Sequence, residues 1–196
     1  MKPLQWINPS TWREENGKLI IIAPADTDYF RNPGQRAQEG ITPEAYANAP
    51  FGYNEVTGDF VLRAKVSHDF KDVYDACVLM IMQDEQVWAK ACFELTDFGT
   101  HAVVSVVTNQ LSDDANGCNI EGNSVWLQAC RVGDAFAFHY SLDGKTFYMM
   151  RYFTIPVGKT VKVGLLAQAP QSKGGERVFE HVTLEQRTVG NIRVGA

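Results

Sequence analysis

The sequence predicts an all-β chain that folds as a two-sheet antiparallel sandwich with little helix. Short runs rich in Val, Ile, Phe and Tyr alternate with clusters of Gly, Asn, Asp or Pro along nearly the whole chain, a pattern typical of a sandwich or barrel. Asp143-Gly144 lies between two aromatic runs, where glycine adopts a positive φ and reverses the chain. The length of 196 residues fits one domain over 1–196, because sandwiches of about 200 residues commonly form a single domain.

Ten runs have the composition and the flanking turn residues expected of strands. In chain order they are Lys18–Ala23, Asp59–His68, Asp75–Gln83, Val87–Thr96, Ala102–Asn109, Ser124–Val132, Ala135–Ser141, Phe147–Thr154, Thr160–Ala167 and Glu176–Gln186. The last residues of Ser124–Val132, together with Gly133 and Asp134, supply the turn into the next strand.

Two segments are predicted as loops because turn-forming residues dominate them. Asp28–Tyr53 carries three prolines with several Ala and Gly, so we expect a long functional loop with one helical turn at Pro43–Tyr46. Leu111–Asn123 is rich in Asp, Asn and Gly and is predicted as a surface loop.

Charge and hydropathy exclude two classes of partner. The formal net charge is -5 and the cationic side chains are scattered singly, so no basic stripe exists to neutralise several phosphates. Met1–Trp6 lacks the apolar run of a signal peptide, and no apolar stretch approaches the roughly 20 residues that span a bilayer. We therefore expect a cytoplasmic protein that binds neither nucleic acid nor membrane.

Cysteine and histidine placement indicates no metal or cofactor. Three of the four cysteines, Cys77, Cys92 and Cys130, lie in apolar strand-like runs and are predicted to be buried and reduced. No C-x-x-C spacing occurs and the four histidines stand far apart, so zinc is not expected. Ser112–Gly117 offers oxygen ligands without the regular order of a helix-loop-helix calcium site; a turn is favoured there, and calcium dependence stays open.

A series of short motifs runs in a common order along most of the chain. It comprises Thr27–Phe30, Gly58–Phe60, Tyr74–Cys77, Trp88–Lys90, Phe93-Glu94, Val106–Asn109, Ser112-Asp113, Tyr140–Phe147, Arg151 and the spaced residues Gly164, Pro170, Gly175 and Phe179. In this order the chain resembles the domain-of-unknown-function family DUF1349, the regulation of enolase protein-like group. The resemblance implies a concanavalin A-like jelly-roll sandwich, similar to lectins and some glycosidases, but it implies no particular activity, because one such fold hosts many functions.

The run Val87–Leu95 contains the most informative polar residues. Strand side chains alternate between faces, so Trp88, Lys90 and Glu94 share one face with Cys92, while the other face is apolar and packs inward. The polar face is expected to line the concave groove where sugars bind in lectin-like relatives. The alternative for Lys90 and Glu94 is a solvated cross-strand ion pair worth less than about 1 kcal/mol.

Phasing the neighbouring runs in the same way extends this groove. The predicted lining residues combine an indole with charged and amide groups, and they are Asp75, Trp88, Lys90, Glu94, Gln128, His139 and Arg151. Aromatic faces stack on the C–H surfaces of sugars, while carboxylate, amide and guanidinium groups satisfy hydroxyls.

Three functions are compatible with these residues. The first is a non-catalytic lectin-like module that binds carbohydrate or another small polar ligand in the groove. The second is a protein-interaction or regulatory domain that uses Asp28–Tyr53. The third is a weak glycoside hydrolase with Glu94 as general acid and Asp75 as its partner, although the chain lacks the Glu-x-Asp-x-Glu and Glu-x-Asp-x-x-Glu runs of lectin-like glucanases. A serine hydrolase and a nucleotide-binding protein are excluded, because neither a G-x-S-x-G elbow nor a phosphate-cradling loop is present.

Overall fold

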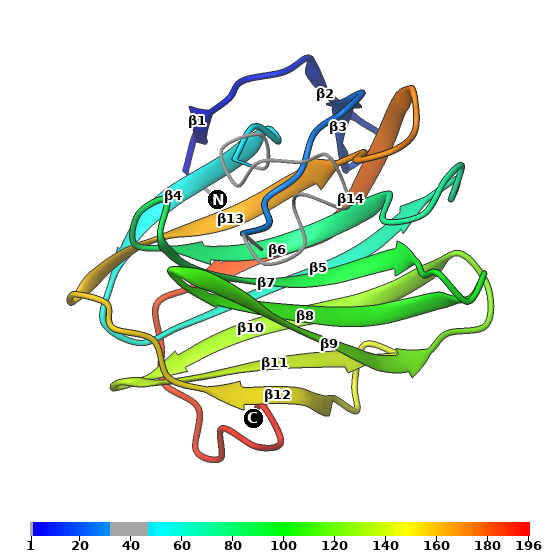
Figure 1. Ribbon diagram of the computed structural model, residues 1–196. Helices are drawn as coiled ribbons and strands as arrows, with labels where there is room; N and C mark the ends of the chain where they lie inside the picture. The colour runs from blue at the N-terminus through cyan, green and yellow to red at the C-terminus, as the bar shows by residue number, and fades with distance from the viewer. Residues whose placement is uncertain (1, 32–46) are drawn as a thin grey trace.

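The computed structural model describes residues 2–31 and 47–196 and confirms the predicted all-β sandwich (Figure 1). The described residues form fourteen strands in two antiparallel sheets of seven, with no helix. The predicted helical turn at Pro43–Tyr46 lies outside the described residues.

The first sheet brings together strands from both ends of the chain. Its order is β1 (Gln5–Ile7), β4 (Phe51–Thr57), β13 (Thr160–Gln168), β6 (Ala76–Met82), β7 (Val87–Leu95), β8 (His101–Asn109) and β9 (Leu111–Asn119). The second sheet has the order β12 (Tyr148–Phe153), β11 (Ala135–Ser141), β10 (Ser124–Val132), β5 (Phe60–His68), β14 (Gly174–Glu185), β3 (Lys18–Pro24) and β2 (Trp12–Glu15).

All ten predicted strands are present, with ends within two residues of the prediction. The prediction of a loop at Leu111–Asn123 is wrong, because β9 covers most of it and pairs with β8 through Ser112, Asp114 and Asn116. β9 is an edge strand whose side chains are mostly exposed, so polar residues suit it and the apolar pattern of a buried strand is missing. The end of the predicted loop at Tyr53 is also wrong, since Phe51–Tyr53 belongs to β4.

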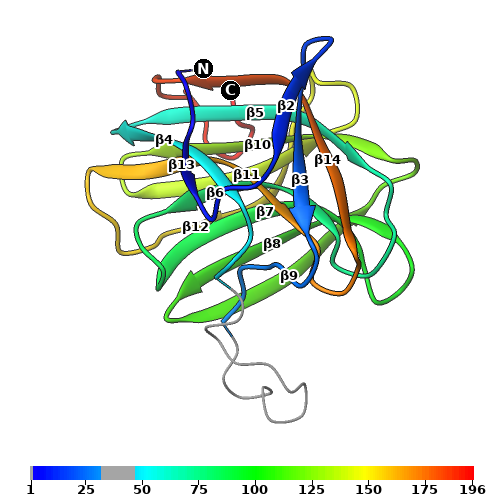
Figure 2. The same cartoon turned by 90° about the horizontal axis from the view of Figure 1, so that it is seen from above.

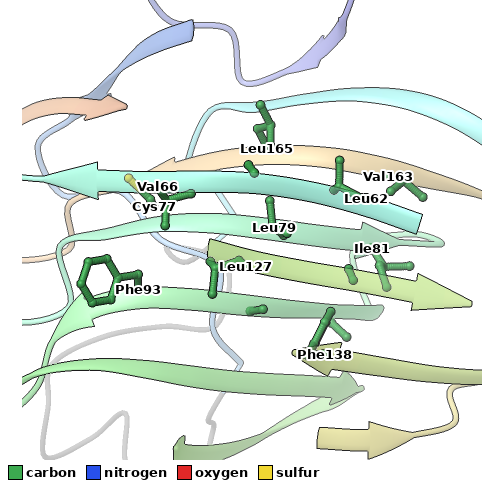
Figure 3. Packing of buried hydrophobic residues seen from close by; sticks show 14 of the residues in the cluster. Leu62, Val66, Cys77, Leu79, Ile81, Phe93, Leu127, Phe138, Val163 and Leu165 are labelled. Carbon is green, nitrogen blue, oxygen red and sulfur yellow. The ribbon is translucent and has the colours of Figure 1, made fainter. Parts of the chain in front are cut away.

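The main apolar core lies between the two sheets (Figure 3). It takes side chains of one parity from each strand, among them Leu62, Leu79, Phe93, Leu127 and Phe138, all fully buried. This confirms that the apolar face of β7 packs inward.

A second apolar cluster covers the opposite, outer face of the first sheet. Val78 and Met80 of β6 contribute to it together with Trp88 of β7, and Tyr29, which follows β3, packs over them. β6 is therefore buried on both faces, which accounts for its continuous apolar run. The outer face of this sheet is consequently not an open solvated surface.

The thiols agree with the sequence prediction. All four cysteines are free, and the three within apolar runs are buried, whereas Cys118 on β9 is exposed. Within the described residues, no helix has the length and hydropathy needed to cross a membrane.

Candidate functional site

The segment that follows β3 builds one wall of a pocket. Thr27 pairs with Ala169, just after β13, through two backbone hydrogen bonds of 3.2 and 3.0 Å. Four residues later, the backbone N–H of Arg31 donates to Ser112 Oγ of β9 at 2.9 Å. The segment thus reaches from β13 to β9 across the outer face of the first sheet, and Figure 2 shows it running past β8 and β9.

Between this segment and the sheet lies a pocket of about 490 Å³. Its floor comes from β7 and β8, one side from β9, and the other from residues around the end of β13 and the loop before β6. The lining residues are Asp28, Phe30, Tyr74, Lys90, Glu94, Thr96, Asp97, Val104, Val106, Asp114, Asn116, Gln168, Pro170 and Gln171.

Lys90 is at the centre of a buried polar group on the pocket floor. Its ammonium Nζ donates to Asp28 Oδ1 and to Gln168 Oε1, both at 2.9 Å. The residue is only 2% exposed. Burial disfavours the charged form, but the Asp28 carboxylate outweighs it and raises the pKa of Lys90. The lysine therefore stays charged, and the alternative of a solvated Lys90–Glu94 ion pair is wrong.

The neighbouring groups fix this arrangement. Asp28 Oδ1 also accepts the backbone N–H of Tyr29 at 2.7 Å, and Gln168 Nε2 donates to the carbonyl of Tyr74 at 3.0 Å. Each partner of Lys90 is thus held by a second hydrogen bond, so the ammonium has a defined position.

Glu94 lies four residues beyond Lys90, on the same face of β7, and is 7% exposed. It forms no ion pair with any residue that the structure describes. Burial raises the pKa of Glu94 to about 8; Lys90 opposes the shift and Asp114 adds to it. The carboxyl is therefore mostly protonated at neutral pH, and in that form it donates a hydrogen bond as well as accepting one.

The rim of the pocket is polar with two aromatic side chains. Tyr74 Oη donates to Asp97 Oδ1 at 2.5 Å, and Phe30 and Tyr74 both line the opening. Asn116 and Gln171 are exposed lining residues whose amides offer donors and acceptors to a ligand. The site can thus satisfy several hydroxyl groups and contact an apolar ring face.

Of the seven predicted site residues, Lys90 and Glu94 line this pocket. Trp88 shares their strand face, as expected, but it is 0% exposed and lies beneath Tyr29, with ring centroids 5.9 Å apart. Its indole therefore packs within the second apolar cluster and does not line the pocket.

Asp75 points to the other side of the sheet. It has the parity of Cys77 and Leu79, which face the core between the sheets, whereas Ala76 is the register partner of Glu94. Its carboxylate lies 3.1 Å from Nη2 of the fully buried Arg177 and accepts from Ser172 Oγ at 2.8 Å. The expectation that Asp75 shares a groove with Glu94 is wrong, and with it the predicted acid pair.

Gln128, His139 and Arg151 belong to the second sheet, so the expectation of one groove for all seven residues is wrong for them too. Gln128 Nε2 donates to the carbonyl of Gly195 at 3.1 Å, and His139 Nε2 lies 2.9 Å from the carbonyl of Ile192; the C-terminal segment covers both. Arg151 on β12 pairs with Asp113 of β9 at 2.6 Å and links the edges of the two sheets. Alternation gives a side chain's parity within one strand, but it does not give the sheet to which the strand belongs.

Several lining residues were not predicted. The largest omission is Asp28, which the sequence indicated only as the start of the predicted loop Asp28–Tyr53, and whose carboxylate accepts a hydrogen bond from Lys90. Asp114 and Asn116 were predicted to lie in a surface loop. Gln168 lies at the end of β13, a strand for which no site residue was predicted. The position of Asp28 in one of the family-like motifs, Thr27–Phe30, was the one available signal.

No cluster of three or more His, Cys, Asp or Glu side chains suited to a metal ion occurs in 2–31 or 47–196.

The comparisons with known proteins agree with this architecture. A model of the family described as "Protein of unknown function (DUF1349)" matches residues 6–187. In sequence the chain is similar to "Regulation of enolase protein 1" of Saccharomyces cerevisiae, with 26% identity over 182 residues that cover 91% of this chain and 87% of that protein. In structure it is similar to a functionally unknown protein from the same yeast, with a TM-score of 0.83, 26% identity, and coverage of 95% of this chain and 98% of that one.

Two more distant structures share the fold. The carbohydrate-binding module CBM66 from Bacillus subtilis has a TM-score of 0.59 and 14% identity, with 94% of this chain and 97% of that one covered. The GH43 protein BlXynB from Bacillus licheniformis has a TM-score of 0.67 and 14% identity, with 90% of this chain and 35% of that one covered. At this identity the likeness concerns the fold alone.

Proposed function

The chain belongs to the DUF1349 family, and we propose that it is a lectin-like module that binds carbohydrate in the pocket on the outer face of the first sheet, without catalysis. The observation that carries this proposal is the buried group of Lys90, Asp28 and Gln168 at the pocket floor. Burying an ion pair costs free energy that a plain apolar floor would avoid. Such a group on a ligand-facing surface supports a role in binding.

The rest of the lining suits a polyhydroxylated ligand. Glu94, Asn116 and Gln171 supply donors and acceptors, while Phe30 and Tyr74 supply aromatic faces. Carbohydrate sites combine these groups because a sugar ring presents hydroxyls at its edge and C–H bonds on its faces. A pocket of about 490 Å³ lies within the range of about 300–1,000 Å³ of small-molecule sites.

Glycoside hydrolysis is a second candidate, favoured by the raised pKa of Glu94, to about 8. A general acid must hold its proton near neutral pH, and this carboxyl does. Hydrolysis also requires a second carboxylate across the scissile bond, and the predicted partner Asp75 faces the opposite side of the sheet. The other carboxyl groups of the pocket are Asp28, which pairs with Lys90, together with Asp97 and Asp114, and a hydrolase would have to use one of these.

A protein-interaction role is the third candidate, supported by the name of the yeast relative, "Regulation of enolase protein 1". Most of the loop expected to serve it, Asp28–Tyr53, lies outside the described residues.

The test is a glycan-array screen followed by thermal-shift titration of each sugar that binds. Glu94→Gln and Asn116→Ala alter the pocket, whereas Glu121→Gln changes an exposed carboxylate outside it. We expect a sugar that raises the melting temperature of the parent and of the Glu121→Gln variant, with a smaller shift in both pocket variants.

Absence of any stabilising glycan, or binding that the pocket variants leave unchanged, would refute the proposal. Chromatography of the bound oligosaccharide after long incubation separates binding from hydrolysis: an intact oligosaccharide supports a binding module, and shortened products that Glu94→Gln abolishes support the glycosidase.

A further inference from the structure

The C-terminal segment, residues 188–196, covers part of the outer face of the second sheet, and Figure 1 shows the C-terminus beside β12. We infer that this segment fills a peptide-binding groove, and that the groove also takes a peptide of a partner protein with the same pattern: two aliphatic residues three positions apart and a glycine three positions further on. The inference does not depend on the carbohydrate pocket, which lies on the first sheet.

Two neighbouring rows of side chains on β5, β10 and β11 form the groove, and the members of each row are in register. The apolar row consists of Val61, Cys130 and Ala137, and the polar row consists of Arg63, Gln128 and His139. The two rows are two residues apart along each strand, so they share one face of the sheet. Their parity is opposite to that of the core residues Leu127 and Phe138, so the groove faces outward.

Every third residue of the C-terminal segment contacts this groove. Val189 is 5% exposed and packs with the apolar row, and the half-buried Ile192 packs against the same cluster. Gly195 is buried on the polar row. The residues between these three positions, 190, 191, 193 and 194, are exposed. A regular spacing of contacts along an irregular segment is how grooves recognise peptides.

The polar row binds two main-chain carbonyl groups. Gln128 Nε2 and Arg63 Nη2 donate to the carbonyl of Gly195 at 3.1 and 3.4 Å. His139 Nδ1 lies 3.2 Å from Gln128 Nε2 and accepts from it, so His139 Nε2 carries the hydrogen and donates to the carbonyl of Ile192 at 2.9 Å. Gln128 and His139 are both 0% exposed. Buried donors require acceptors, so whatever covers this row must supply two carbonyl groups in this arrangement.

The third position of the pattern requires glycine. The φ of Gly195 is +69°, which L residues rarely adopt. A Cβ atom at this position would lie 2.2 Å from Gln128 Nε2 and 3.2 Å from His139 Nδ1, and the hydrogen bonds of the polar row hold both side chains in place. The groove is therefore selective for sequence although its polar contacts go to the main chain.

The C-terminal segment is docked on the sheet and is not one of its strands. Among the described residues, its backbone hydrogen bonds are internal: Asn191 N–H donates to the carbonyl of Ala196 at 2.8 Å, and the N–H groups of Val194 and Gly195 donate to the carbonyl of Asn191 at 3.2 and 3.0 Å. The family match ends at residue 187, so the groove lies within the matched domain and its occupant does not. A turn that forms its own hydrogen bonds can be replaced by an equivalent turn of another chain.

Fluorescence anisotropy with a labelled peptide of residues 188–196 tests this on the full chain. Val189→Asp places a carboxylate against the apolar row and should release the chain's own segment, and Gly195→Val should release it by crowding Gln128. We expect saturable binding of the peptide to both variants and binding to the parent about tenfold more weakly. This factor follows if the tethered segment, at an effective concentration of about 1 mM, competes with a peptide whose Kd is about 0.1 mM.

Matched peptides and one further variant assign the binding to the groove. A peptide with Val194→Ala changes an exposed position and should bind as well as the original, whereas a peptide with Gly195→Val should not bind. Adding Gln128→Leu to the Val189→Asp chain removes the donors to the Gly195 carbonyl and should abolish binding. The parent titrated with the two peptides provides the test even if neither tail variant folds.

Three results would overturn the inference. Absence of binding to the folded Val189→Asp and Gly195→Val chains would show that the groove takes no segment from another molecule. Binding to these chains but none to the parent at millimolar peptide would make the C-terminal segment a permanent part of the fold that no partner displaces. A dimer of the parent in light scattering, abolished by Val189→Asp, would make the occupant the segment of a second copy instead of a partner protein.

Discussion

Replacing Glu94 by glutamine should remove a specific pH dependence from the stability of this protein. Burial raises the pKa of this carboxyl from 4.5 in its ordinary state to about 8 in the folded chain. The folded state therefore holds a proton that the unfolded state has released between these two values. Stability falls as pH rises through this window, because ionising Glu94 is easier in the unfolded chain.

The size of the effect follows from the two pKa values. Between pH 6 and pH 9, the contribution of Glu94 to the free energy of unfolding falls by about two pKa units, or about 3 kcal/mol at 1.36 kcal/mol per unit. For a chain of this length, 1 kcal/mol changes the melting temperature by about 2–4 °C. The parent should therefore lose roughly 5–10 °C more than Glu94→Gln over this range.

The assay is urea unfolding of the parent and Glu94→Gln at half-unit steps from pH 6 to pH 9, with the difference in unfolding free energy plotted against pH. Taking the difference cancels the titration of every group that both proteins share. Asp114→Asn should shift the midpoint of the parent's decline to lower pH, because Asp114 is one of the groups that raise the pKa of Glu94, and Glu121→Gln should leave the curve unchanged. Parallel curves for the parent and Glu94→Gln would refute the assignment of Glu94 as a buried protonated acid.

Three further predictions concern groups outside the pocket. Burial lowers the pKa of His68 to about 3, so NMR should show no titration of its ring between pH 8 and pH 5. The free energy of unfolding should decline as pH falls below about 6.5, the pKa of histidine in the unfolded chain. A titration midpoint of the His68 ring above about pH 5.5 would contradict this. Asp75→Asn removes the closer of the two carboxylates beside the buried guanidinium of Arg177, at 3.1 Å against 3.8 Å for Asp69, and should cost about 3 kcal/mol in urea unfolding. Glu121→Gln, at an exposed carboxylate away from Arg177, should cost less than about 0.5 kcal/mol; equal costs would be inconsistent with a buried ion pair. A thiol reagent should label one cysteine, Cys118, in the native protein and all four after unfolding. The other three cysteines are buried, and burial raises the pKa of the thiols of Cys77, Cys92 and Cys130. Rapid labelling of a second thiol in the native protein would contradict this.

The fold was largely readable from the sequence because its core strands carry local signals. β7 alternates polar and apolar residues, and a Gly133-Asp134 turn separates β10 from β11, so the ends of these strands can be predicted from the sequence. β9 has no such local signal, because its residues are polar, as suits an exposed edge strand, and its strand structure comes from backbone pairing with β8. Short strands such as β1, of three residues, exist only because a neighbouring strand offers them a partner.

Only part of the site could be predicted from the sequence, because most of its residues come from different strands: two of the seven predicted residues, Lys90 and Glu94, line the pocket. Alternation along β7 correctly placed Lys90 and Glu94 on one face, because parity is a property of a single strand. The groups that give this face its chemistry come from far along the chain: Asp28 lies 62 residues from Lys90 and Gln168 lies 78 residues from it. The positions of Asp28 and Gln168 beside Lys90 depend on the order of strands in the sheet and on the path of the segment after β3 across it. A local sequence pattern predicts neither.

Gln128 has a parity as well defined as that of Glu94, yet it lies on the other sheet and contacts the C-terminal segment. The pKa of Glu94 also depends on the assembled fold, because the burial that raises it requires the segment after β3 and β9 to enclose the carboxyl. The chemistry of this pocket is thus a property of the assembled sandwich, and variants that loosen the segment at Thr27 should lower the pKa of Glu94 without touching the residue itself.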